Sequence, residues 1–232
     1  MNDRGLHDLS EDSTGFGRAE LRTIRDALIR PRQQLEVYMA GQSTGDGGYA
    51  RPLRLYLTLC GLMLLIMIFS GGTKPMLNLL PEEVLAWFTA ASGKSRDAFI
   101  GDADNLIGLI IVPIMSALYA LAFTPLLRAW DPDDLGWRRG FRASFVYLNA
   151  ATIPMIPFTW MVYADDLSLW STILISLIMF VTFMRMGPGR WFLSPILGVL
   201  KGVTLIIVMQ VVGLLGYFLV IPLGLFGAML TP

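Results

Sequence analysis

Residues 137–163 read WRRGFRASFVYLNAATIPMIPFTWMVY, in which a basic, aromatic edge leads directly into an uncharged apolar segment. This pattern is typical of a membrane-spanning helix that begins on its cationic side. Arginine is costly inside hydrocarbon, and loops rich in Lys and Arg stay in the cytoplasm. Arg138, Arg139 and Arg142 are therefore expected to set the topology of this span and of the spans on either side of it.

The composition of the whole chain is that of a membrane protein. Of its 232 residues, 54% are hydrophobic and 16% are charged, whereas an average soluble domain has about 25% charged residues. We predict an all-α integral membrane protein, a bundle of five transmembrane helices with an amphipathic cytoplasmic helix before them. The expected spans are residues 53–70, 106–127, 143–163, 167–184 and 202–223. Pro222 is expected to end the last span and to leave residues 224–232 as an interfacial tail.

The chain before the first span divides into two parts. The expected domains are a disordered tail at 1–17, cytoplasmic amphipathic helices and a linker at 18–52, and the membrane domain at 53–232. In the first amphipathic helix, apolar residues recur at helical spacing and arginines occupy other faces. One prediction is that this helix lies in the headgroup region, with Arg18, Arg22 and Arg25 in contact with the membrane surface. The alternative is that it packs on the protein's own cytoplasmic loops.

The distribution of charge predicts the orientation of the bundle. With the N-terminus inside and five spans, fourteen Lys and Arg residues lie in inner segments and three lie in outer segments, with Arg54 inside the first span. The cytoplasmic side of a membrane protein carries the excess of Lys and Arg. We therefore expect the N-terminus in the cytoplasm and the C-terminus outside.

Three short stretches resemble a known family. They are TIRDALIRP at residues 23–31, YMAG at 38–41 and RPLRLY at 51–56, and a Gly216-Tyr217 pair follows in the last span. Together they are similar to uncharacterised bacterial five-span proteins of the Yip type. The resemblance implies a five-span fold and, with the plain N-terminus, a bacterial inner membrane location. The Asp-Leu-Tyr-Gly-Pro element of eukaryotic members is missing from this sequence, so the resemblance does not imply a small-GTPase partner.

Two strongly polar residues lie inside the expected spans. Asn149 and Gln210 are at similar distances from the cytoplasmic ends of spans three and five. They are expected to form an interhelical hydrogen bond or, alternatively, to line a polar site or pore. Gly198, Gly202, Gly213 and Gly216 have the spacing at which helix backbones approach closely, either within the bundle or against another protein.

The residues needed for most chemistry are missing from the spans. The only cysteine is Cys60 and the only histidine is His7, so neither a thiolate metal site nor a histidine-based triad can be assembled. No Asp, Glu, Lys, Arg or His lies in the middle of a span, where ion-coupled carriers need them. We therefore expect no catalytic or metal site, no small-molecule cofactor and no nucleic acid partner.

The function that remains is a non-enzymatic scaffold, assembly factor or accessory subunit. Its expected partners are membrane lipid and other membrane proteins or a second copy of the chain. The alternative is a permease, channel-like or lipid-handling component with a path between spans two, three and five. An intramembrane enzyme is the least favoured class, because a nucleophile and a base are lacking.

Overall fold

The computed structural model describes residues 17–41, 48–78, 80–133, 135–164 and 167–231. Within these ranges the chain forms helices and no strand. The helices are α2 (Arg18–Ile29), α3 (Pro31–Met39), α4 (Pro52–Phe69), α5 (Lys74–Leu77), α6 (Glu82–Ser92), α7 (Arg96–Trp130), α8 (Trp137–Met155), η1 (Ile156–Tyr163), α9 (Ser168–Met186) and α10 (Pro195–Leu230). The predicted tail, except for Gly17, and residues 42–47 of the linker lie outside the described residues.

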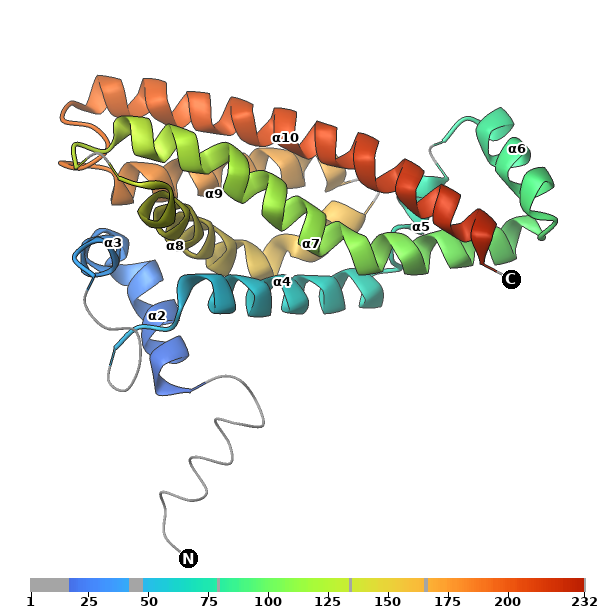
Figure 1. Cartoon of the computed structure of the whole chain (residues 1–232), viewed down its shortest axis with the longest axis horizontal. Helices are drawn as coiled ribbons and strands as arrows, with labels where there is room; N and C mark the ends of the chain where they lie inside the picture. Colours follow the sequence, from blue (N-terminus) through green and yellow to red (C-terminus); the bar gives the residue numbers. More distant parts are fainter. Residues whose placement is uncertain (1–16, 42–47, 79, 134, 165–166, 232) are drawn as a thin grey trace, which may run out of the picture.

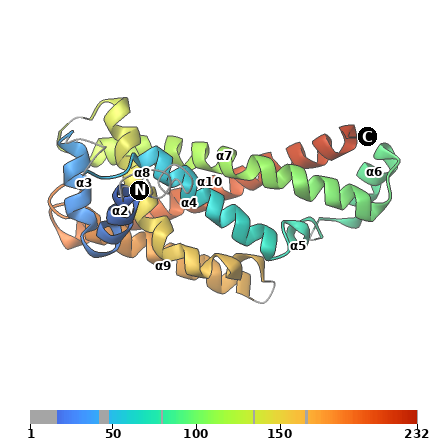
Figure 2. The same ribbon diagram turned by 90° about the horizontal axis from the view of Figure 1, so that it is seen from below.

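Five of the described helices are long and apolar enough to cross a membrane, which confirms the predicted class of fold. Four of them, α4, α7, α9 and α10, run along the long axis of the molecule, and α8 crosses this direction at a steep angle (Figures 1 and 2). The predicted first and fourth spans agree with α4 and α9 to within about two residues at every end, within the usual uncertainty of helix boundaries.

The second span is much longer than predicted. α7 has 35 residues and begins at Arg96, in a region where a loop was expected. Ser95 caps its first turn by accepting a hydrogen bond from Ala98 N (3.4 Å). Charged residues at 96–104 lower the mean hydropathy of this part of the helix, so a prediction based on hydropathy did not include it.

The last span also differs from the prediction. α10 has 36 residues and continues as one helix through Pro222 to Leu230, so Pro222 does not end the helix as expected. A proline removes one backbone hydrogen bond and kinks a helix. In an apolar environment the other backbone N–H and C=O groups still need hydrogen-bond partners, and a continuing helix provides them. Ser194 caps the start of α10 and Pro195 occupies its first turn.

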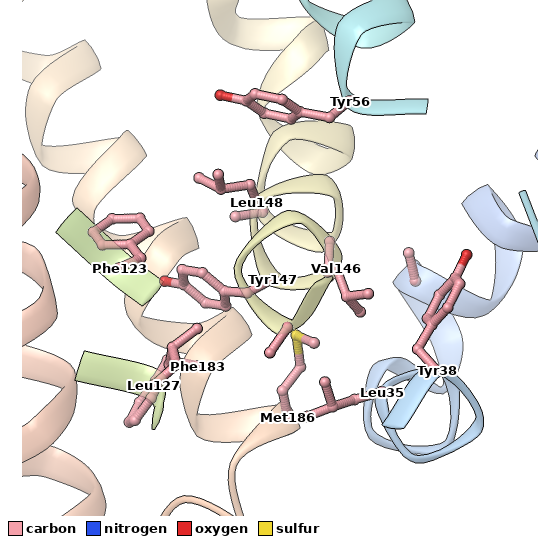
Figure 3. Close-up of a cluster of buried hydrophobic side chains, with 14 of the residues drawn as sticks. Leu35, Tyr38, Tyr56, Phe123, Leu127, Val146, Tyr147, Leu148, Phe183 and Met186 are labelled. Carbon is pink, nitrogen blue, oxygen red and sulfur yellow. The ribbon is translucent and has the colours of Figure 1, made fainter. Parts of the chain in front are cut away.

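The third span changes its helix type partway. α8 carries Pro154 in its last turn, and the chain then continues as the 3-10 helix η1, which contains Pro157. Pro154 and Pro157 stand only three residues apart, so two N–H groups are missing within one turn, whereas Pro222 removes a single one from α10. α8 lies at the centre of the bundle, and side chains from α3, α4, α7 and α9 surround it (Figure 3).

The apolar interior forms two clusters. The larger surrounds α8, where Tyr147 packs against Phe123 and Phe183 and donates a hydrogen bond to the Met179 carbonyl (2.9 Å). The smaller lies at the other end of the molecule, where α6 covers the start of α7 and the end of α10. Phe88 of α6 contributes to this second cluster.

The N-terminal helices form a hairpin, here called the α2–α3 hairpin. It packs against α8 and α9 at the end of the bundle opposite α6 (Figures 1 and 2). The two loops that join α7 to α8 and α9 to α10 lie at this same end. The described parts of the arginine-rich segments at 18–41, 48–54, 128–133, 135–142 and 185–201 are thus gathered at one end of the molecule.

Candidate functional site

Asn149 and Gln210 do not bind each other, so their predicted pairing is wrong. Asn149 is buried, and its Nδ2 donates to the Pro52 carbonyl at the start of α4 (2.8 Å). Gln210 is on an exposed face of α10, and its Nε2 donates to Ser176 Oγ of α9 (3.0 Å). Each side chain therefore joins two helices, but Asn149 does so in the interior of the protein and Gln210 on its outer surface. The alternative function, a path between spans two, three and five, was based on this pair of residues, and the structure removes that basis.

The four predicted packing glycines of α10 face the bundle itself. A Cβ on Gly198 would meet the Phe192 ring, and one on Gly202 would meet Phe180. A Cβ on Gly213 would lie 3.3 Å from Tyr119 Oη, and a Cβ on Gly216 would overlap the Met115 sulfur. The glycines lie against other side chains of this chain, so they do not offer a docking surface to another protein.

Of the arginines before span three, two point outward and one joins two elements. Arg138 and Arg139 are exposed on the first turn of α8. Arg142 is half-buried and donates from Nη1 to the Tyr38 carbonyl of α3 (3.2 Å). Arg142 thus helps to fix the hairpin to the bundle, a role that the sequence did not predict.

Helix α2 has its polar side chains inside and several apolar ones outside. Glu20, Thr23 and Asp26 are buried against the protein, whereas Leu21 and Ile29 are each 62% exposed. The exposed arginines Arg18, Arg22 and Arg25 lie beside this apolar stripe. In a water-soluble protein the arrangement would be reversed.

A hydrogen-bonded network holds the buried face of α2. Tyr49 Oη donates to Asp26 Oδ2 (2.8 Å), and Arg25 Nε donates to Asp26 Oδ1 (2.9 Å). Burial alone would raise the pKa of Asp26, but these hydrogen bonds and the charges of Arg25 and Arg22 lower it. Burial and the neighbouring carboxylate raise the pKa of Tyr49. The carboxylate is therefore held ionised, and it fixes the segment after the linker to α2.

A second network, here called the Arg190 clamp, joins three loops or helices. Arg190 makes a bidentate ion pair with Asp131, through Nε to Oδ2 (2.6 Å) and Nη2 to Oδ1 (3.0 Å). The same guanidinium also contacts Asp133 (2.9 Å) and Glu36 (3.1 Å). Burial by itself would lower the pKa of Arg190, but the three carboxylates outweigh it and raise the pKa. The acidic loop 131–133 therefore holds an arginine of this chain.

An apolar groove of about 240 Å³ lies between the end of α2, α8 and α9. Leu28 of α2 and the exposed Leu177 and Val181 of α9 line it. Arg185 at its rim donates from Nη2 to the Leu28 carbonyl (2.7 Å), which satisfies the last turn of α2. The apolar stripe of α2 is thus continuous with the outer surface of α9.

The described residues contain no group of three or more His, Cys, Asp and Glu side chains arranged to hold a metal ion. The fold and these surfaces define the class: an integral membrane protein built on a five-helix bundle. No family model, curated protein or solved structure matches the chain. The similarity to the Yip family therefore stays a prediction from the sequence.

Proposed function

We propose that this protein is a non-enzymatic membrane scaffold, assembly factor or accessory subunit that binds lipid and other membrane proteins. The observation that carries this proposal is the inverted helix α2. Its polar residues Glu20, Thr23 and Asp26 are buried within the protein, and its apolar residues Leu21, Leu28 and Ile29 face outward beside arginines. A helix with this arrangement gains stability only when an apolar environment covers its outer face.

The position of α2 supports a membrane interface as that environment. Leu28 continues the exposed surface of α9, so the apolar stripe is an extension of the lipid-facing surface. The neighbouring arginines suit the anionic headgroups of a cytoplasmic leaflet, where each contributes about 1 kcal/mol. The hairpin would then present α3 and the basic loops to a partner on the cytoplasmic side.

Spin labels test this position directly. In a Cys60→Ala background, single cysteines at Leu21, Leu28 and Gln33 carry a nitroxide in lipid vesicles. We expect the first two labels to collide more with oxygen than with a water-soluble nickel reagent, and the label at Gln33, exposed on α3, to do the reverse. Equal nickel accessibility at all three positions would refute the interfacial position of α2.

The proposal also includes an orientation with the N-terminus in the cytoplasm. It is supported by the excess of Lys and Arg at the end of the bundle that carries the hairpin. A pair of reporters, one active only in the cytoplasm and one only outside, is fused to the C-terminus. Activity of the cytoplasmic reporter would contradict the proposed orientation.

A further inference from the structure

A second groove, here called the α4–α7 groove, lies at the far end of the bundle from the hairpin. Its volume is about 540 Å³. The residues that line it include Met67, Ile68, Lys74, Asp104, Asn105 and Leu109. Its walls are apolar, while its mouth carries one cation, one carboxylate and one amide. The last turn of α4 forms one wall, so the mouth lies where this apolar helix ends.

The walls of the groove face lipid. Ile68 is 56% exposed and Leu109 is 70% exposed on either side of it. Gly108 faces α4, and a Cβ there would lie 3.7 Å from the Met67 methyl group. The groove between the last turns of α4 and residues 104–109 of α7 is therefore open to the bilayer, and an acyl chain is the ligand that such walls suit.

The carboxylate at the mouth is held in a fixed position. Asp104 Oδ1 accepts hydrogen bonds from Thr73 N (2.5 Å) and Thr73 Oγ1 (2.7 Å). Its other oxygen, Oδ2, would lie 2.5 Å from a Cβ at position 72, so only glycine leaves it room. Gly72 also has a φ of +73°, which favours glycine independently. The loop thus presents a carboxylate with one oxygen committed to the protein.

The cation at the mouth differs from the other cations at this end. Lys94 pairs with Asp102 (2.6 Å), and Arg96 pairs with Glu82 (2.8 Å). Lys74 is exposed, and among the described residues no ion pair joins it to Asp104 or to another carboxylate. Two opposite charges that share a groove without neutralising each other suit a ligand that carries both charges.

We propose that the α4–α7 groove binds a membrane phospholipid whose headgroup carries a phosphate and a primary ammonium. The ammonium donates hydrogen bonds to Asp104 and the Asn105 amide, Lys74 binds the phosphate, and one acyl chain lies between α4 and α7. A quaternary ammonium has no N–H to donate, and an anionic headgroup without an ammonium is repelled by Asp104. This inference depends on the groove alone and not on the position of α2.

Native mass spectrometry of the delipidated full chain in detergent tests the proposal. The probes are phosphatidylethanolamine, its mono-, di- and trimethylated forms, and phosphatidylglycerol, all with identical acyl chains. A charge-assisted hydrogen bond is worth about tenfold in affinity, so we expect about that preference for the primary ammonium over the trimethylated form. Affinity should fall with each methyl group added. Equal binding of all the probes would overturn the proposal without any mutation.

Variants identify the residues that carry the preference. Asp104→Asn keeps an acceptor for Thr73 but loses the charge, so the primary ammonium should lose its preference over the trimethylated form. Lys74→Gln should weaken both of these lipids alike, since both carry the phosphate. Asp97→Asn, an exposed carboxylate on the first turn of α7, is the matched control and should change nothing. Unchanged selectivity in folded Asp104→Asn would refute the assigned site even if α2 lies in the membrane interface.

Discussion

Replacing Asp131 by asparagine tests the Arg190 clamp with little change of shape. The side chains of Asp131 and Arg190 are 0% and 8% exposed, so the pair is shielded from water. Breaking a buried ion pair by removal of one partner costs about 3–5 kcal/mol. Asparagine keeps one acceptor oxygen, and Glu36 and Asp133 still face the guanidinium, so we expect about 2–3 kcal/mol. For a chain of this size that free energy corresponds to a fall in Tm of about 4–12 °C.

Asp133→Asn is the matched control, because Asp133 contacts the same guanidinium but is 60% exposed. Exposed ion pairs contribute about 0–1 kcal/mol, so its Tm should fall by at most about 4 °C. The assay is thermal unfolding of the purified protein in a mild detergent, followed by circular dichroism and tryptophan fluorescence. In an Arg190→Gln background, Asp131→Asn should cost much less than in the original protein. Equal Tm values for the two asparagine variants would refute the clamp.

Three further predictions use the same assay. Asn149→Leu should lower the free energy of unfolding by about 1–2 kcal/mol, since it removes a buried hydrogen bond to the Pro52 carbonyl. Gln210→Leu should lower it by less than about 0.6 kcal/mol, because Gln210 is exposed. Equal losses for the two variants would contradict this assignment. Gly224→Ala forces a methyl group into a buried isoleucine and should cost about 1–3 kcal/mol, whereas Gly61→Ala, with open space around it, should be neutral or stabilising. The lowered pKa of Asp26 stabilises the fold fully above its unfolded value of 3.8, and this contribution is lost as the pH falls below that value. The Tm of the original protein should therefore fall more steeply below pH 4 than that of Asp26→Asn, and parallel curves would exclude the effect.

The sequence predicted the five spans because hydropathy reports directly on transfer into hydrocarbon, and this physical signal is local. It predicted the packing glycines of α10 for a similar reason, since their spacing follows the helical repeat. It failed at Asn149 because the partner is a backbone carbonyl of Pro52, to which no residue type gives a clue. Similar depth in two spans indicates level in the membrane, but not the face on which a side chain lies.

The docking of the hairpin was beyond prediction for another reason. The hydrogen bonds from Tyr49 to Asp26 and from Arg142 to Tyr38 join residues far apart in sequence. The amphipathic pattern of α2 indicated a surface helix but left open which of its faces would bind the bundle. Burial of the polar face became possible because Thr23 and Asp26 find partners there. The sequence alone does not show which residues those hydrogen-bond partners are.

The length of α10 gives α6 a physical role. Its 36 residues extend about 54 Å, and at a typical tilt of about 20° they cover about 51 Å of the membrane normal. A whole bilayer with its headgroups is about 40–45 Å thick, so at that tilt at least one helical turn extends beyond it. At the far end, Phe88 of α6 packs edge-on against Phe226 (5.3 Å between centroids), and Lys94 donates to the Ala228 carbonyl (3.1 Å) and to Thr231. α6 therefore packs over part of the apolar surface of α10 that the bilayer is too thin to cover. This role explains why the chain between α4 and α7 forms a helix at α6.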